Sequence, residues 1–267
     1  MRVAFFLDGA AGRVFCTGTL HPDDRSVRGR LLIVPPLAEE MNKSRHLLAA
    51  IARTAGDAGF DVILPDLFGT GDSGGDFADA TIDIWRSDLD QAVERMHAAA
   101  PLHIVALRAG ALLAGDLLAR HPVQTFTLLH PQTDGRQVLN QLLRLRLAGG
   151  LLAGGGKETA TQLRRRLADG EALEIAGYAL SAAMAAGLES LSLEAMPLET
   201  VRQIHWIELV PQAERPLMPV SQRIVDTWTA AGKTVTTSLI VCDQFWATQE
   251  IAQCPAVVAT VMQPLVG

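Results

Sequence analysis

Short apolar runs alternate with amphipathic stretches along most of this chain, and that alternation limits the folds open to it. Runs of this length and composition are typical of strands covered on both faces of a sheet. They lie at 31–34, 60–64, 103–107 and 125–129. Helical patterns fall between them, at about 43–58 and 85–96. Because strand, helix, strand is the crossover unit of a parallel sheet, the sequence predicts a doubly wound, mostly parallel α/β fold.

The two ends of the chain extend this pattern. A glycine-rich turn separates two β-like runs, 3–7 and 13–20, and predicts an N-terminal hairpin. Near the C-terminus the sequence predicts two further strands, a helix between them and a closing helix, at 204–210, 221–231, 234–241 and 255–263.

The stretch from Asp134 to about Thr200 interrupts the alternation. It contains a leucine-rich segment, the hinge-like Gly154-Gly155-Gly156, and helical patterns at 161–167 and 172–188. We therefore expect a core formed by 1–135 and 200–267. A helical lid, 136–199, is inserted after the sixth strand.

The strand predicted at 103–107 leads directly into a small-residue helix. In serine hydrolases such a strand-to-helix turn, the nucleophile elbow, carries the motif G-x-S-x-G. Here the five positions are Ala106-Leu107-Arg108-Ala109-Gly110, and a guanidinium, which stays protonated, cannot attack a carbonyl group. A histidine base should follow the last strand, yet none occurs after His205, and Glu214 therefore has no base to orient. The pattern predicts an α/β-hydrolase fold without a standard Ser-His-Asp triad.

Charged residues crowd the loop after the first parallel strand, close to the expected position of Arg108. A cation at a helix N-terminus meets an unfavourable dipole, ~0.3–1 kcal/mol, and partial burial adds a desolvation cost. A carboxylate should therefore lie nearby, and Glu39 or Glu40 is the expected partner, with Asp243 or a bound anion as alternatives. In a catalytic protein, Arg108 would stabilise an oxyanion or clamp a carboxylate while Glu39 or Glu40 activates water. In a non-catalytic one, a buried ion pair fixes the loop.

Other residues remain candidates for the site. His130, at a strand end, is a candidate base, although a hydrogen-bonded structural histidine is the more common case. Ser44 and Cys242 are alternative nucleophiles, and Ser73 belongs to a glycine-rich turn expected to brace the sheet. The expected ligand-binding residues are Glu39, Glu40, Asn42, Lys43 and Arg108.

Charge and cysteine content narrow the class of protein. A net charge of -6 gives no support to nucleic-acid binding. The cysteines Cys16, Cys242 and Cys254 lack metal-ligand spacing, which predicts reduced thiols in a cytoplasmic protein. No stretch approaches the ~18–20 apolar residues of a membrane-spanning helix. We expect no metal and no cofactor, and a small-molecule or acyl ligand as partner.

The lid is basic within an acidic chain. Between Arg136 and Arg166 there are seven basic residues, and Glu158 is the only acidic one. One interpretation is a solvated helix face. The other is a basic amphipathic surface that contacts an anionic substrate or anionic lipid, which would place the protein at the periphery of the inner membrane.

Six segments are similar to the exosortase A system-associated hydrolases of the second type. They are 36–45, 66–73, 75–80, 107–110, 142–148 and 245–251, and arginine at the elbow is part of the resemblance. Proteins of that family are encoded beside bacterial PEP-CTERM sorting and exopolysaccharide genes. The resemblance implies an α/β-hydrolase-fold protein acting on an acyl or glycan-linked intermediate, and the alternative is a non-catalytic anion-binding or scaffold protein. Two departures are Pro35, where many relatives have histidine, and Asp243-Gln244 before Phe245.

Overall fold

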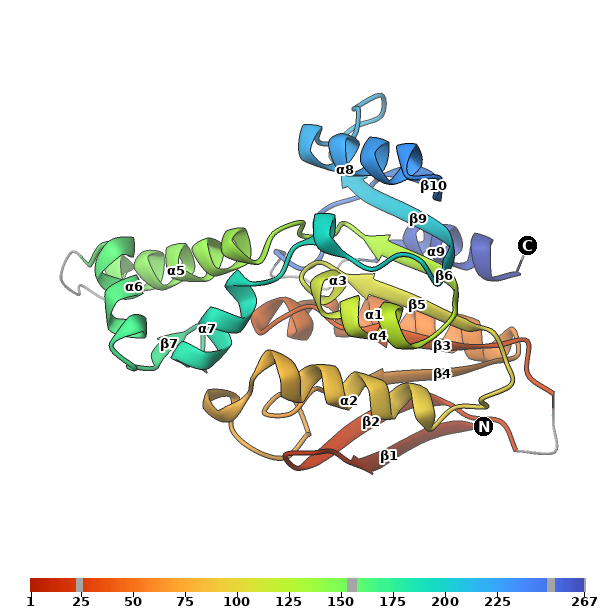
Figure 1. The fold of residues 1–267 in the computed structure, drawn as a ribbon, viewed down its shortest axis with the longest axis horizontal. Coiled ribbons are helices and arrows are strands. Elements are labelled where there is room, and N and C mark those ends of the chain that lie inside the picture. The colour runs from red at the N-terminus through yellow and green to blue at the C-terminus, as the bar shows by residue number, and fades with distance from the viewer. Residues whose placement is uncertain (23–25, 153–157, 249–252, 267) are drawn as a thin grey trace.

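The computed structural model describes residues 1–22, 26–152, 158–248 and 253–266, and an eight-stranded sheet runs through it (Figure 1). The strand order is β1-β2-β4-β3-β5-β6-β9-β10. The N-terminal hairpin is antiparallel, β2 pairs antiparallel with β4, and the remaining pairs are parallel. The strands are β1 (Arg2–Asp8), β2 (Arg13–Thr19), β3 (Gly29–Val34), β4 (Phe60–Pro65), β5 (Leu102–Leu107), β6 (Val123–Leu129), β9 (Val201–Val210) and β10 (Thr234–Val241).

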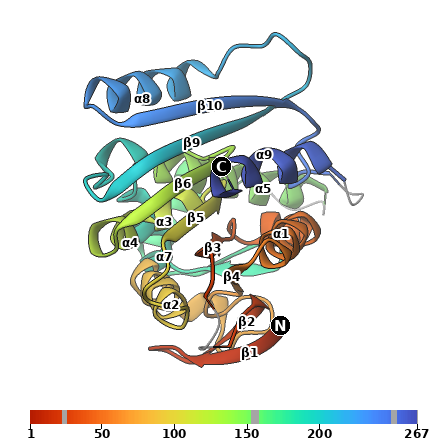
Figure 2. The same ribbon diagram turned by 90° about the vertical axis from the view of Figure 1, so that its right-hand side faces the viewer.

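Helices cover both faces of the sheet (Figure 2). Alternate side chains of β3 enter different cores, with Leu32 and Val34 in one and Leu31 and Ile33 in the other, as the twofold period of a strand requires. The first core contains residues of α2 (Ile82–Glu94), α3 (Gly110–Leu113), α4 (Gly115–Arg120) and α8 (Pro219–Ala230). The second contains residues of α1 (Glu39–Asp57) and α9 (Pro255–Val266). The doubly wound architecture is therefore confirmed.

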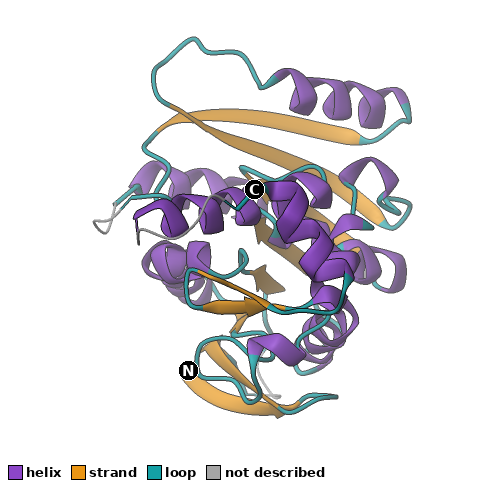
Figure 3. Cartoon of the chain, turned by 90° about the vertical axis from the view of Figure 1, so that its left-hand side faces the viewer, coloured by secondary structure: helices purple, strands orange, loops and turns teal. Residues whose placement is uncertain are grey.

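The lid lies between β6 and β9 and extends from one end of the sheet (Figure 1). Figure 3 views the molecule from the side on which the lid lies. Backbone pairing between Asp134 and Ser192 joins the two ends of the insertion. Its elements are α5 (Gly135–Leu152), α6 (Ala160–Ala168), β7 (Leu173–Ile175), β8 (Tyr178–Leu180) and α7 (Ala182–Glu189). The proposed hinge Gly154-Gly155-Gly156 lies outside the described residues.

Three details differ from the sequence-based expectations. The helix predicted over 172–188 is wrong in its first half, because Ala176 (φ 50°) and Gly177 (φ 86°) form a left-handed two-residue turn that joins a small hairpin. Helix α1 begins at Glu39 rather than near Lys43, and its first turn carries two carboxylates, which suit the positive end of a helix. The helix after the elbow is divided at Ala114 into α3 and α4.

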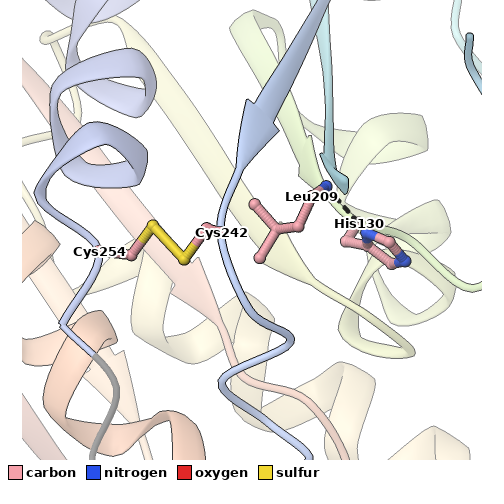
Figure 4. The surroundings of a disulfide bond; sticks show 4 residues. All are labelled: His130, Leu209, Cys242 and Cys254. Atoms are coloured by element: carbon pink, nitrogen blue, oxygen red, sulfur yellow. Dashed lines mark hydrogen bonds between the residues drawn. A yellow bond between two sulfur atoms is a disulfide. The ribbon is translucent and has the colours of Figure 1, made fainter. Parts of the chain in front are cut away.

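The prediction of reduced cysteines is wrong for two of the three. Cys242 follows β10 and Cys254 precedes α9, and they form a disulfide with their Cα atoms 6.5 Å apart (Figure 4). The bond depends on the chain turning back between β10 and α9, which has no local signature in the sequence. Cys16 is free and buried. None of the helices in the described ranges combines the length and apolar character that a bilayer crossing requires.

One buried carboxyl group of the core gives a test of this fold. Asp88 of α2 is 1% exposed and accepts a hydrogen bond from the Phe68 N–H at 2.9 Å, while its other oxygen finds no partner among the described residues. Burial raises the pKa of Asp88 to about 6, against the effect of that hydrogen bond. Folding therefore disfavours the charged form, so the stability that protonated Asp88 supplies is present at low pH and is lost as pH rises through about 6.

We expect Asp88→Asn to raise the free energy of unfolding by about 2 kcal/mol at pH 8 and to have little effect near pH 4. Chemical denaturation at both pH values measures the difference. The control is Asp83→Asn on the same helix, where the side chain is 92% exposed. Equal stabilisation by Asp88→Asn at both pH values would contradict the raised pKa.

Candidate functional site

The chain bends sharply where β5 ends, as the elbow motif predicts. Arg108 has a φ of 54°, a left-handed conformation that is rare outside glycine. Main-chain hydrogen bonds hold the bend, because the Arg108 N–H donates to Leu129 O at 3.1 Å and its carbonyl oxygen accepts from the Ala111 and Gln132 N–H groups. The side chain at position 108 is therefore presented at the carboxyl end of the parallel strands.

The elbow glycine is required by close packing. A Cβ on Gly110 would lie 2.4 Å from the carbonyl oxygen of Pro35 in the loop after β3. We expect Gly110→Ala to lower the free energy of unfolding by about 1–3 kcal/mol, because backbone must move to admit the methyl group. Gly115→Ala, at the start of α4, is the control, since its Cβ would meet nothing within 4 Å. Equal effects of the two changes in denaturant titrations would refute the packing argument.

The Arg108 guanidinium is paired and buried. Its Nε lies 3.3 and 3.4 Å from the two carboxylate oxygens of Glu40, and Nη2 lies 3.2 Å from Glu40 Oε1. Nη1 donates to the carbonyl oxygen of His130 at 3.3 Å, and the group lies 4.7 Å from the centre of the Trp246 ring. The Arg108 side chain is 8% exposed. Of the two expected partners Glu40 forms the ion pair, whereas Glu39 has no ion-pair partner within the described ranges.

Glu40 lies in the first turn of α1 and keeps 18% of its side chain exposed. Burial raises the pKa of Glu40 above its ordinary value, and the charge and hydrogen bonds of Arg108 offset this only in part. A carboxylate with a raised pKa accepts a proton more readily near neutral pH than an ordinary surface glutamate does.

His130 lies beside the ion pair as a neutral structural group. Its Nδ1 accepts a hydrogen bond from the Leu209 N–H at 3.0 Å, which leaves the ring proton on Nε2 (Figure 4). Burial, together with the charge of Arg108, lowers the pKa of His130 to about 4. The ring contacts Trp246 with 4.8 Å between centroids. Because Nδ1 is already engaged, His130 offers no free nitrogen for a general base in this arrangement.

Strained backbone gathers at this edge of the sheet. Three non-glycine residues with positive φ follow three strands that are neighbours in the sheet: Ala38 (51°) after β3, Arg108 (54°) after β5, and His130 (43°) after β6. Conformations of this kind cost on the order of 1–3 kcal/mol each and concentrate at functional sites. The strain therefore marks the same place as the charge pair.

A cavity of about 460 Å³ lies between the elbow and lid helix α5. Its volume is that of a small-molecule site. The lining residues are Leu37, Glu39, Glu40, Lys43, Ala109, Gln132, Val138, Gln141, Leu142, Arg144, Leu145, Gln244, Trp246 and Ala247. Of the predicted ligand-binding residues, Glu39, Glu40 and Lys43 line it. Arg108 does not, and Asn42 donates instead to the Tyr178 hydroxyl of the lid at 3.0 Å. The candidate base His130 is also absent from the lining.

Two backbone N–H groups of cavity-lining residues are free. Neither Leu37, in the loop after β3, nor Ala109, directly after the elbow residue, donates a hydrogen bond to another described residue. In α/β-hydrolases the oxyanion hole has two backbone donors. One is the N–H of the residue after the nucleophile, and the other is an N–H from the loop after the strand that corresponds to β3 here. Leu37 and Ala109 occupy the positions from which such donors come, although position 108 carries no serine.

Among the described residues, none of the alternative nucleophiles considered, Ser44, Ser73 and Cys242, lines this cavity. Ser73 accepts a hydrogen bond from the Phe15 N–H at 2.7 Å and donates to the Asp66 carbonyl oxygen, so it braces β2 against the end of β4. Ser44 is fully buried, and Cys242 is in the disulfide.

Neither acidic residue near the end of β9 serves the cavity. Glu214 is exposed in the loop after β9. Glu208, which no sequence pattern singled out, is buried in β9 and accepts hydrogen bonds from the Trp206 indole N–H and the Met218 N–H, both at 3.1 Å.

Much of the positive charge predicted for the lid is paired. Arg164 pairs with Glu189, Arg166 with Glu158 and Glu171, and Arg165 with Asp169 at 3.8 Å. Three of these four acids follow position 166, so they lie outside the stretch in which Glu158 is the only acidic residue. Contact with an anionic membrane surface stays a prediction.

The chain matches no protein-family model and no curated protein in sequence. In structure it resembles the esterase Est1E from Butyrivibrio proteoclasticus with bound ferulic acid, with a TM-score of 0.63, 14% identity and coverage of 97% of this chain and 96% of that one. It also resembles proline iminopeptidase from Mycobacterium smegmatis, with a TM-score of 0.61, 13% identity and coverage of 98% and 97%. For the thioesterase domain from the curacin biosynthetic pathway the values are 0.58, 12%, 98% and 100%. The chain therefore has the α/β-hydrolase fold.

Proposed function

We propose that this chain hydrolyses an acyl ester or thioester in the cavity under α5, with water as the nucleophile and Glu40 as the general base. The observation that carries the proposal is that a carboxylate with a raised pKa, Glu40, lines the same cavity as Leu37 and Ala109, whose N–H groups donate to no other described residue. Attack by water needs no side-chain nucleophile at position 108.

The reaction balances with these groups alone. Glu40 takes a proton from water while the water oxygen bonds to the carbonyl carbon, and the resulting oxyanion accepts hydrogen bonds from the Leu37 and Ala109 N–H groups. Collapse of the tetrahedral intermediate breaks the C–O or C–S bond. The leaving alkoxide or thiolate takes the proton back from the Glu40 carboxyl group, and the products are an acid and an alcohol or thiol.

Arg108 acts in this scheme as a positioning residue. Its guanidinium is engaged with Glu40, the His130 carbonyl oxygen and the Trp246 ring, and it does not line the cavity. It holds the Glu40 carboxylate in place and limits how far burial raises its pKa. The backbone donors, rather than Arg108, stabilise the oxyanion, and Lys43 is a cation that does line the cavity.

The substrate class rests on two kinds of resemblance. Structural neighbours include an esterase with bound ferulic acid and a thioesterase domain, which favours an acyl compound. The sequence resemblance to exosortase A system-associated hydrolases favours a substrate among the acyl or glycan-linked intermediates of exopolysaccharide production or protein sorting. With it we place the protein in the cytoplasm or at the inner face of its membrane.

The ion pair favours a second function, a non-catalytic protein that binds an acyl compound. A buried and satisfied Arg108–Glu40 pair also fixes a loop in a protein that has lost its reaction.

One experiment separates these functions. The purified chain is given a panel of acyl esters and thioesters, with turnover followed by product formation and the protein followed by intact mass. We expect turnover without an acyl-enzyme adduct and without labelling by fluorophosphonate. Binding without turnover would establish the second function, and a covalent acyl adduct would overturn the water mechanism.

A further inference from the structure

The cavity wall separates into an apolar side and a cationic mouth. Val138, Leu142 and Leu145 of α5 lie at i, i+4 and i+7, so one face of the lid helix supplies the apolar wall opposite Leu37.

The apolar side continues beneath the lid. Leu37 and Leu142 also border a second, small hollow whose other walls come mainly from the lid. Those walls are Ala38, Phe77, Ile175, Tyr178, Leu180, Met184 and Leu188. Met184 and Leu188 belong to α7, and a flexible methionine adapts readily to an apolar guest. The hollow has a volume of only about 10 Å³, so it adds apolar lining beside Leu142, and the room for an acyl chain lies in the 460 Å³ cavity along α5.

The polar side carries two unpaired cations. Lys43 of α1 and Arg144 of α5 both line the cavity and are exposed, and neither has an ion-pair or hydrogen-bond partner among the residues that the structure places. The neighbouring lid arginine Arg146, by contrast, interacts with Glu158 and the Glu174 carbonyl oxygen.

The charge balance at the mouth is positive. Glu40 is neutralised by Arg108, which leaves Glu39 against the two cations. In a chain with a net charge of -6, this local excess favours an anionic group at the mouth.

We propose that the substrate is an acyl ester or thioester whose leaving alcohol or thiol carries an anionic group, a phosphate or a carboxylate, held at the mouth by Lys43 and Arg144 while the acyl chain lies against Leu142. This inference rests on the proposed function and specifies its substrate. A phosphate-bearing thiol carrier and an acylated acidic sugar share this chemistry.

The charge part is tested by comparing acyl compounds of one chain length. The arms are an acyl phosphopantetheine, an acylated uronic acid and the corresponding neutral ester, each measured for Kd by calorimetry and, where turnover occurs, for kcat/KM. We expect the anionic compounds to be favoured. Lys43→Ala and Arg144→Ala should each lower the anionic-to-neutral ratio by about fivefold, and the preference should weaken with salt. The anionic compound with the larger preference over the neutral ester identifies the anion.

Arg136→Ala is the matched control. Arg136 is an exposed arginine on the same helix, two turns before Arg144, and it does not line the cavity. A ratio that is the same in all three variants, or a preference for the neutral ester, would overturn the anionic assignment.

The chain part is tested with two changes at one position. Leu142→Trp should move the preferred acyl length to shorter chains and Leu142→Ala to longer ones. Unchanged length profiles in both variants would refute this placement. Kd is measured for every compound in addition to kcat/KM. A protein that binds the anionic compounds selectively but never hydrolyses them would therefore refute the hydrolase proposal and leave this inference standing.

Discussion

Glu40→Gln should reduce kcat for acyl-ester hydrolysis by about 100- to 10,000-fold, the range that a general base contributes. Glutamine has nearly the same shape and can still accept a hydrogen bond from Arg108, but it cannot take a proton from water. KM should change far less than kcat, because the cavity wall is retained. Steady-state kinetics on the most active substrate of the panel measures the effect.

The pH profile gives a second readout of the same change. Burial raises the pKa of Glu40, so wild-type activity should fall as pH drops through a pKa above that of an ordinary glutamate. Residual activity of Glu40→Gln should lack this limb. Glu39→Gln is the neighbouring comparison, since Glu39 lines the cavity but forms no ion pair among the described residues, and it should cost no more than a few-fold. Equal losses in the two variants would remove Glu40 from the role of base.

Arg108→Met should lower the free energy of unfolding by about 3 kcal/mol, as expected when one partner of a buried ion pair is removed. The Glu40 carboxylate would then stay in its mostly buried position without a cation, and its pKa would rise further. Methionine approximates the length of the arginine stem, so loss of charge dominates over loss of volume. Denaturant titration at neutral pH measures the change.

A double-mutant cycle isolates the pair. Arg108→Met combined with Glu40→Leu should recover a large part of the lost stability, because the uncompensated charge is gone. The acidic limb of the pH–activity profile of Arg108→Met should also move to higher pH, because the pKa of Glu40 rises. An arginine that acts on stability alone, away from the base, would leave this limb unchanged. Unchanged stability in the single variant would show that the ion pair contributes nothing to the fold.

Sequence patterns predicted the fold where side chains report burial directly. The continuous apolar runs indicated β3 to β6 because both faces of those strands are covered. The sharp turn at Arg108 was predicted because the apolar run of a strand there leads directly into the small residues of a helix that begins at Gly110. A partner for Arg108 was expected because a cation at a helix start requires a counter-charge, and Glu40 supplies it.

Features set by long-range packing escaped prediction. Nothing local distinguishes Ala38 or His130 from residues with ordinary backbone, yet both adopt positive φ because neighbouring strands and loops constrain them. The lid hairpin was missed because an alanine shares its turn with Gly177. Arg108 does not line the cavity, and one of its contacts, the Trp246 ring, comes from a loop more than a hundred residues later in the chain.

The bend at position 108 is held by main-chain atoms, so its shape does not depend on which side chain it carries. A scaffold of this kind can exchange its reacting group by a single codon change without rebuilding the fold. Serine at this position would inherit the bend but would meet no imidazole poised to activate it, because the His130 ring is committed to Leu209. A change from arginine to serine at the elbow would therefore not by itself give covalent catalysis on this fold. The backbone of the elbow accommodates either residue, but a general base beside the serine would also have to be acquired.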